Sequence, residues 1–175
     1  MKLRILMALM VSSFSLQSFA GLLIDPYVGV GQTKSTVDFL TTDETDTEPY
    51  NAFGARLGYS FLLISAGIDY EMAKSESDGE DVDITNTSVF VGVDLPILLR
   101  AWAEYFISSD LDVDGSTADY EFSDGYGIGV GFTGLPFVSL NLEIQNLNYD
   151  ITQGSLKGDL STASTIFSVS LPLDL

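Results

Sequence analysis

The chain has 175 residues and a formal net charge of −18, with 25 acidic residues against 7 basic ones. So acidic a chain is a poor partner for nucleic acid, whose phosphates are neutralised by lysine and arginine. The sequence is 46% hydrophobic, which excludes a disordered polyanion, and it contains no cysteine and no histidine. Disulfide scaffolds, zinc sites built from thiolates or imidazoles, and nucleophiles activated by histidine are therefore excluded too.

The first twenty residues have the features of an export signal. Lys2 and Arg4 precede an apolar run over 5–11, and residues 18–20 form a small-x-small cleavage site. The apolar run is too short to cross a bilayer as a helix. We therefore predict a signal peptide over 1–20 and one domain over 21–175. The mature domain is more acidic still, because cleavage removes two basic residues and no acidic one.

Beyond residue 20, eight segments alternate apolar and less apolar residues with a period of two, which is typical of strands with one apolar face. In chain order they cover 24–31, 52–61, 64–72, 88–95, 99–107, 120–132, 138–145 and 167–175. Polar segments near 33–50, 74–86, 108–119 and 150–162 alternate with short connections at 61–64, 95–98 and 133–136. The pattern predicts four β-hairpins with long loops at one end and tight turns at the other.

A helix is the alternative for "LLRAWAEYFISS", which also fits a helical period. Its neighbours do not, because glycines alternate with apolar residues over 125–131 in a way that a stable helix does not tolerate. The sequence therefore predicts an all-β fold.

The less apolar strand face distinguishes a soluble sheet from a membrane barrel. A soluble sheet exposes lysine, glutamate and threonine on that face, whereas a membrane barrel turns it into a narrow lumen and presents its apolar face to lipid. Here the face is mostly glycine, serine and asparagine with a few ions, and the strand cores hold no lysine. Together with the export signal, this favours an eight-stranded antiparallel up-and-down barrel in the bacterial outer membrane. A soluble ligand-binding barrel is the alternative.

The export signal, the four hairpins and the alternation that ends at Leu175 make the chain resemble the small eight-stranded outer-membrane barrels of the OmpA transmembrane-domain and opacity-protein type. The resemblance implies a monomer with both termini and the short turns in the periplasm and long acidic loops outside. It also implies recognition of the last strand by the barrel-insertion machinery, although Leu175 stands where the family usually has an aromatic residue. Outer-membrane barrel enzymes use a catalytic histidine, so no enzymatic activity is expected.

Hairpin register places charged pairs in the predicted lumen. Folding about 61–64 sets Arg56 opposite Asp69, and folding about 95–98 sets Asp94 opposite Arg100. Both pairs point inwards, where a lone charge is costly and a hydrogen-bonded pair is tolerated. Further acidic residues of the same face are predicted to join this network: Glu71, Glu104 and Glu143.

Two interpretations of the lumen follow. In the first, Trp102, Phe90 and Phe106 fill the space beside the glycines of 125–131 and form a packed plug, because eight strands leave room for little more than side chains. In the second, the charges line a narrow or gated channel for small solutes.

The stretch "DLDVDGSTADYE" matches the spacing of an EF-hand calcium loop, with the candidate ligands Asp110, Asp112, Asp114 and Glu121. An EF-hand needs a helix on each side, whereas strands are expected here. A solvated acidic hairpin tip, diffuse screening by cations and a specific site are the three alternatives. Calcium or magnesium at the acidic loops is expected because lipopolysaccharide is itself anionic and would otherwise repel them.

Two lysines and two sets of aromatic residues indicate how the barrel meets its membrane. Lys34 and Lys74 continue the outward face at the predicted outer rim and are candidate contacts for lipopolysaccharide. The aromatic residues fit interfacial girdles: Tyr70, Tyr105 and Tyr126 towards that rim, and Tyr59, Phe61 and Phe132 towards the other. The sequence thus predicts a non-enzymatic barrel that contributes to envelope integrity and surface display, with adhesion through acidic loops, and a narrow porin as the alternative.

Overall fold

The structure is a computed structural model that describes residues 21–39, 42–77, 80–113, 118–153 and 156–175. The predicted signal peptide lies outside these residues. Within them the chain forms the strands β1 (Gly21–Phe39), β2 (Thr42–Phe61), β3 (Ile64–Ser77), β4 (Glu80–Leu95), β5 (Leu99–Val113), β6 (Asp119–Phe132), β7 (Ser139–Gln153), β8 (Leu156–Ser170) and β9 (Leu173–Asp174). None of the described segments is a helix long and apolar enough to span a bilayer.

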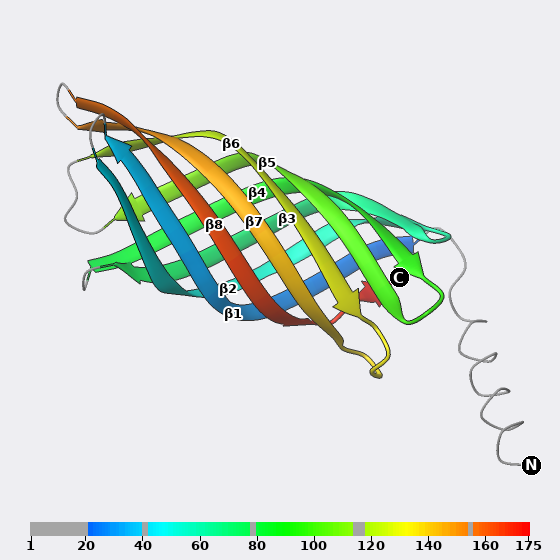
Figure 1. The fold of residues 1–175 in the computed structure, drawn as a ribbon. Coiled ribbons are helices and arrows are strands. Elements are labelled where there is room, and N and C mark those ends of the chain that lie inside the picture. The colour runs from blue at the N-terminus through cyan, green and yellow to red at the C-terminus, as the bar shows by residue number, and fades with distance from the viewer. Residues whose placement is uncertain (1–20, 40–41, 78–79, 114–117, 154–155) are drawn as a thin grey trace, which may run out of the picture.

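The sheet closes into a barrel (Figure 1). Each strand from β2 to β7 pairs antiparallel with both of its neighbours in the chain, and β1 pairs with both β2 and β8. The predicted eight-stranded up-and-down fold is therefore confirmed. The last predicted strand is not continuous to Leu175, because it breaks at 171–172 and resumes as β9, which pairs with β1. Pro172 at the break has no N–H to donate to a ladder.

The two ends of the barrel differ. At one end, called here the short-turn end, compact connections at 62–63, 96–98 and 133–138 join β2 to β3, β4 to β5 and β6 to β7. At the other, the long-hairpin end, strands extend well past the central barrel (Figure 1). The N-terminal start of β1 and the C-terminus both lie at the short-turn end.

The long polar loops expected at 33–50, 74–86, 108–119 and 150–162 are mostly strand. β1 and β2 stay in register from Gly21↔Ser60 to Phe39↔Thr42, and β7 and β8 from Ser139↔Ser170 to Gln153↔Leu156. These segments are polar on their outer face but keep a period of two, and the first of them is rich in threonine, which favours strands. Length and polarity alone were therefore poor indicators of a loop.

The inner and outer faces exchange polarity along the strands. On β7 the inner residues change from Asn141, Glu143 and Gln145 to Leu147, Tyr149 and Ile151, all of them buried. The outer residues change over the same interval from Leu140, Leu142 and Ile144 to Asn146, Asn148 and Asp150. The part of the barrel next to the short-turn end, called here the lower barrel, is thus apolar outside and polar inside, as in a membrane barrel. The long-hairpin end instead has the apolar interior and polar exterior of a water-soluble sheet.

Candidate functional site in the barrel lumen

Glycines of β6 make room for the large inward side chains of β5. The strand register sets Gly131 opposite Arg100, Gly129 opposite Trp102 and Gly127 opposite Glu104. A Cβ atom at any of these glycines would overlap the side chain across from it. The alternating glycines of the sequence are therefore the space into which the lumen residues pack.

Arg56 on β2 is the centre of the lumen and is buried at 2% exposure. Its Nε lies 3.0 Å from Asp69 Oδ2, its Nη2 lies 2.5 Å from Glu143 Oε2, and its Nη1 lies 3.7 Å from Asp25 Oδ2. The register Arg56↔Asp69 is the one that the tight turn predicts. A cation so far from water needs this coordination by several carboxylates to offset its lost hydration.

Arg100 on β5 has a different partner from the one the sequence predicts. Its strand register with Asp94 is as expected, but its Nη2 lies 2.7 Å from Asp25 Oδ2 and donates to Asn141 Oδ1 at 3.1 Å and Ser170 Oγ at 3.0 Å. The predicted Asp94–Arg100 ion pair is therefore wrong. Asp25 is completely buried on β1, whereas Asp94 remains partly exposed at the short-turn end, so the guanidinium turns into the barrel.

Two aromatic rings complete the cationic layer. The Cζ atom of Arg56 lies 4.7 Å from the ring centroid of Tyr27 and 4.3 Å from that of Trp102, and Arg100 Cζ lies 5.2 Å from Trp102. Cation–π contacts of this kind are stronger away from water. Asp25 and Tyr27 were missing from the predicted network, although their inward parity on the first strand was a usable signal.

Glu71 forms the next layer towards the long-hairpin end and is held by neutral donors. Its carboxylate accepts hydrogen bonds from Tyr27 at 3.1 Å, Tyr50 at 2.8 Å, Asn86 at 3.0 Å and Gln145 at 3.3 Å. Such a set of hydroxyl and amide donors satisfies a buried carboxylate without a cation.

The two remaining predicted glutamates also lie in this layer. Glu143 accepts a hydrogen bond from Gln145 at 2.7 Å besides its ion pair with Arg56. Glu104 accepts one from Ser88 at 2.9 Å. The structure thus brings Glu71, Glu104 and Glu143 together in the buried, hydrogen-bonded interior of the barrel.

Apolar side chains close the lumen above the charged layers. One cluster contains Tyr50, Ala52, Ala73, Val82, Ile84 and Ile166, and a second contains Phe106, Leu147, Tyr149, Ile151 and Leu160. Ser109 links them to the polar layers through hydrogen bonds to Asn86 at 2.5 Å and Tyr149 at 2.6 Å. The lumen is therefore filled by side chains in its centre and at its long-hairpin end.

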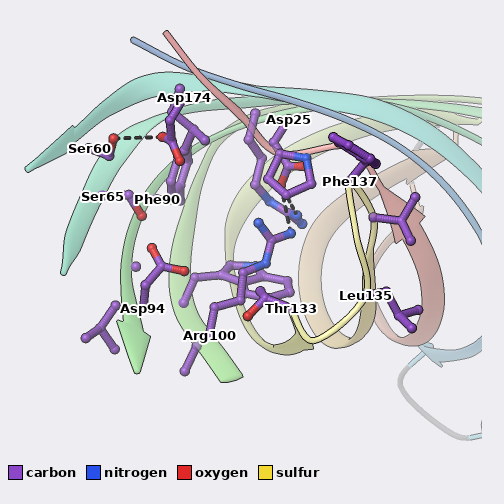
Figure 2. Close-up of a pocket in the computed structure, with 18 residues that line it drawn as sticks. Asp25, Ser60, Ser65, Phe90, Asp94, Arg100, Thr133, Leu135, Phe137 and Asp174 are labelled. Carbon is purple, nitrogen blue, oxygen red and sulfur yellow. Dashed lines mark hydrogen bonds and ion pairs between the residues drawn. The ribbon is translucent and has the colours of Figure 1, made fainter. Parts of the chain in front are cut away.

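A cavity of about 210 Å³ opens at the short-turn end and is called here the vestibule. Figure 2 shows Arg100 and Asp25 at its inner side, Asp94 and Asp174 on one side, and Leu135 and Phe137 on the other. Asp174 accepts a hydrogen bond of 2.8 Å from Ser60, which fixes the C-terminal segment at the rim. The vestibule reaches inward to Trp102 and Arg56, where the packed layers begin.

The outer wall of the long-hairpin end is acidic. Glu121, Asp150 and Asp159 are exposed and lie opposite one another on the adjacent strands β6, β7 and β8. Like charges in directly opposed positions repel each other. On the other side of the barrel Lys74 Nζ pairs with Asp83 Oδ1 at 2.7 Å.

The segment 110–121 is not flanked by the two helices that an EF-hand requires. Asp110 and Asp112 are exposed on β5, Glu121 is exposed on β6, and Asp114 lies outside the described residues. Strands flank the segment in place of the helices of an EF-hand. Among the residues whose placement is described, no group of three or more acidic side chains is arranged to hold a metal ion. Cation binding here stays a prediction.

The outward residues of the lower barrel form a continuous apolar surface. Valines, leucines and isoleucines of every long strand are exposed on it, with the six predicted girdle residues Tyr59, Phe61, Tyr70, Tyr105, Tyr126 and Phe132. Lys34 is exposed above this surface on β1. A water-soluble protein rarely exposes so large an apolar area.

The model of a family described as outer membrane protein beta-barrel domain matches residues 6–171. The chain belongs to this family. Its exposed apolar surface is accordingly the surface that faces lipid in the bacterial outer membrane. No curated protein matches the chain.

Solved structures of small outer-membrane barrels are similar in fold. Neisserial surface protein A is 16% identical, with 83% of this chain and 96% of that chain covered and a TM-score of 0.50. OprG of Pseudomonas aeruginosa is 8% identical, with 90% and 98% covered and a TM-score of 0.46. Ail of Yersinia pestis is 13% identical, with 86% and 99% covered and a TM-score of 0.46.

Proposed function

We propose that this protein is a non-conducting, monomeric outer-membrane barrel that stabilises the envelope and presents a rigid acidic platform at the cell surface. The observation that supports it most directly is the filled lumen, in which Arg56 and its carboxylates lie below a closed apolar core. In this proposal the long-hairpin end projects outwards, and both termini and the short turns face the periplasm.

A permanent pore would require several layers to separate at once. The guanidinium of Arg56 would lose contacts with three carboxylates, and the apolar clusters above it would have to admit water. Removing one partner from such a buried ionic cluster leaves an uncompensated charge, which strongly opposes opening.

Conductance in planar lipid bilayers tests the closed lumen. We expect pure refolded protein to show no steady openings. A variant with Trp102→Ala and Phe106→Ala, which empties part of the lumen, checks that the assay detects a pore, and Tyr105→Ala on the lipid-facing side serves as the matched control. Steady, ion-selective openings of the unaltered protein would favour a channel.

The alternative of a narrow channel has one observation in its favour. The vestibule opens at the short-turn end, and Arg100 and Asp25, which form an ion pair, belong to its lining. A channel would use this pair as its constriction and would open by displacing the layers above it. The conductance measurement distinguishes this alternative from the plug.

The platform is proposed to mediate adhesion through its carboxylates. The row formed by Glu121, Asp150 and Asp159 lies on paired strands with an apolar core behind them, so its charges are held at fixed spacing. Such a surface attracts cationic partners and, through calcium or magnesium, anionic ones such as lipopolysaccharide. Lys34 and Lys74 are proposed to contact lipopolysaccharide phosphates directly.

Adhesion is tested with cells that display the variant Glu121→Gln, Asp150→Asn and Asp159→Asn. We expect weaker attachment to a polycation-coated surface than for cells with Thr152→Ala, an uncharged change at an exposed position on the same strand and face as Asp150. Equal attachment of the two strains at equal surface abundance would contradict the adhesive role and leave the closed barrel unaffected.

A further inference from the structure

The three short turns carry large apolar side chains at their tips. They are Leu62, Leu63, Ile97, Leu98, Leu135 and Phe137, called here the apolar collar, and all are exposed, from 41% for Leu135 to 84% for Phe137. The turns themselves, at 62–63, 96–98 and 133–138, contain no charged residue. Water is a poor environment for such a collar, because each exposed apolar side chain forgoes the free energy of burial.

One residue in each short turn has a strained backbone conformation. Among the described residues, the non-glycine residues with positive φ are Leu62 at 57°, Leu98 at 62° and Phe137 at 69°, one in each short turn. Glycine adopts this left-handed conformation readily, and asparagine tolerates it better than a branched or bulky residue does. Three of the six collar side chains are thus held at strained backbone positions while they are exposed, which points to a contact outside the chain that buries them.

The lipid-facing strands are short for a membrane without the collar. At about 3.3 Å per residue and a tilt of about 40°, the outward apolar run from Phe53 to Phe61 on β2 covers roughly 20 Å along the barrel axis. The run from Leu140 to Ile144 on β7 covers roughly 10 Å on the same basis. The apolar band of outer-membrane barrels is about 25 Å tall. The collar adds apolar surface at the short-turn edge of this band, next to the short apolar run of β7.

We propose that the apolar collar is embedded in the bilayer, at the boundary between acyl chains and head groups, so that the short turns are part of the lipid-contacting surface. In the first two turns the collar continues the outer apolar face without a polar break, since Phe61 and Ile64 flank Leu62 and Leu63, and Leu95 and Leu99 flank the turn with Ile97 and Leu98. In the third turn, Leu135 and Phe137 also line one side of the vestibule. The same lipid therefore covers the outer apolar face and the collar of the first two turns. This inference does not depend on whether the lumen conducts.

Single-cysteine labelling tests the proposal cleanly, because the chain has no cysteine of its own. Leu63→Cys and Ile97→Cys, neither at a strained position and neither lining the vestibule, are labelled with an environment-sensitive fluorophore and reconstituted in phosphatidylcholine vesicles. Tyr59→Cys on the lipid-facing surface and Thr152→Cys on the outer wall of the long-hairpin end are the matched controls. Heat-dependent mobility on a denaturing gel confirms that each variant is folded before labelling.

We expect the labels at 63 and at 97 to behave like the label at 59. Their emission should shift to the blue, nitroxide-bearing lipids should quench them, and iodide in the buffer should lose access to them, whereas the label at 152 should show the opposite. Quenching by iodide at 63 and 97 as strong as at 152 would overturn the proposal. Disulfide cross-linking between copies through these positions at high lipid dilution would overturn it too, by showing that a second copy covers the collar.

Discussion

Trp102 on β5 lies opposite Gly129 on β6, and its indole ring occupies the space that a side chain at position 129 would need. The same complementarity recurs one pair to each side, at Arg100 with Gly131 and at Glu104 with Gly127. The inward glycines of β6 are therefore a structural requirement of the plug.

Gly129→Val should destabilise the barrel by about 1–3 kcal/mol, the usual effect of overfilling a packed interior. Unfolding by urea in detergent micelles, followed by circular dichroism, measures the change. The double variant Gly129→Val with Trp102→Ala removes the clash, so it should be more stable than the sum of the two single effects predicts. Strict additivity of the two changes would show that the two side chains do not compete for the same space.

The strand pattern and the hairpin register could be predicted from the sequence because both are local. A two-residue turn at 62–63 fixes Arg56 opposite Asp69, and every further pair of that hairpin follows from it. The partner of Arg100 could not be predicted in this way. Asp25 lies on β1, across the lumen from β5, so the contact depends on how the whole sheet closes.

The exchange of polarity between the two faces is present in the sequence, but the strand predicted over 138–145 ends before it, and the loop predicted near 150–162 covers its remainder. Residues 147, 149 and 151 are apolar and alternate with polar residues, with the same period as the strand before them. The alternation is reversed, so that the apolar residues point inwards and the polar residues outwards. The reason is that these residues pack inside a part of the barrel that water surrounds. Detecting this needs a search for a phase reversal rather than for a loss of hydrophobicity.

Arg56→Met should destabilise the barrel by about 3–5 kcal/mol, because it leaves the buried carboxylates of Asp69 and Glu143 without their cation. Methionine keeps the aliphatic stem, so the change removes the guanidinium with its charge, its hydrogen bond to Glu143 and its ring contacts. Lys74→Met is the matched control. Its ion pair with Asp83 is exposed, and surface pairs of this kind contribute about 0–1 kcal/mol. The loss of folded, heat-modifiable protein on gels gives the comparison, and equal losses would refute a central role for Arg56.

Leu147→Ala should loosen the long-hairpin end while leaving the lipid-facing barrel intact. Leu147 is 2% exposed within the apolar cluster of that end, and truncating a buried leucine costs about 2–5 kcal/mol. Limited proteolysis of the protein in vesicles measures the effect, with faster cleavage expected in the extended hairpins. Asn146→Ala, one residue away on the outer face, should leave the cleavage rate unchanged. Loss of the membrane-protected fragment itself would show that the two parts of the barrel do not unfold separately.

Asp159→Asn should stabilise the protein at low ionic strength. Asp159 lies directly opposite Asp150, whose other neighbour is Glu121, and opposed like charges destabilise a sheet by about 0.2–1 kcal/mol. Because all three side chains are exposed, salt should screen the repulsion. The advantage of the variant should therefore shrink as ionic strength approaches 1 M, where the Debye length is about 3 Å.

Asp110→Asn is the control, since Asp110 faces Thr85 and loses no opposed charge of the same sign. Thermal unfolding in detergent at low and high salt makes the measurement. A stabilisation that persists in high salt would assign the effect to hydrogen bonding of the new amide rather than to the relief of repulsion.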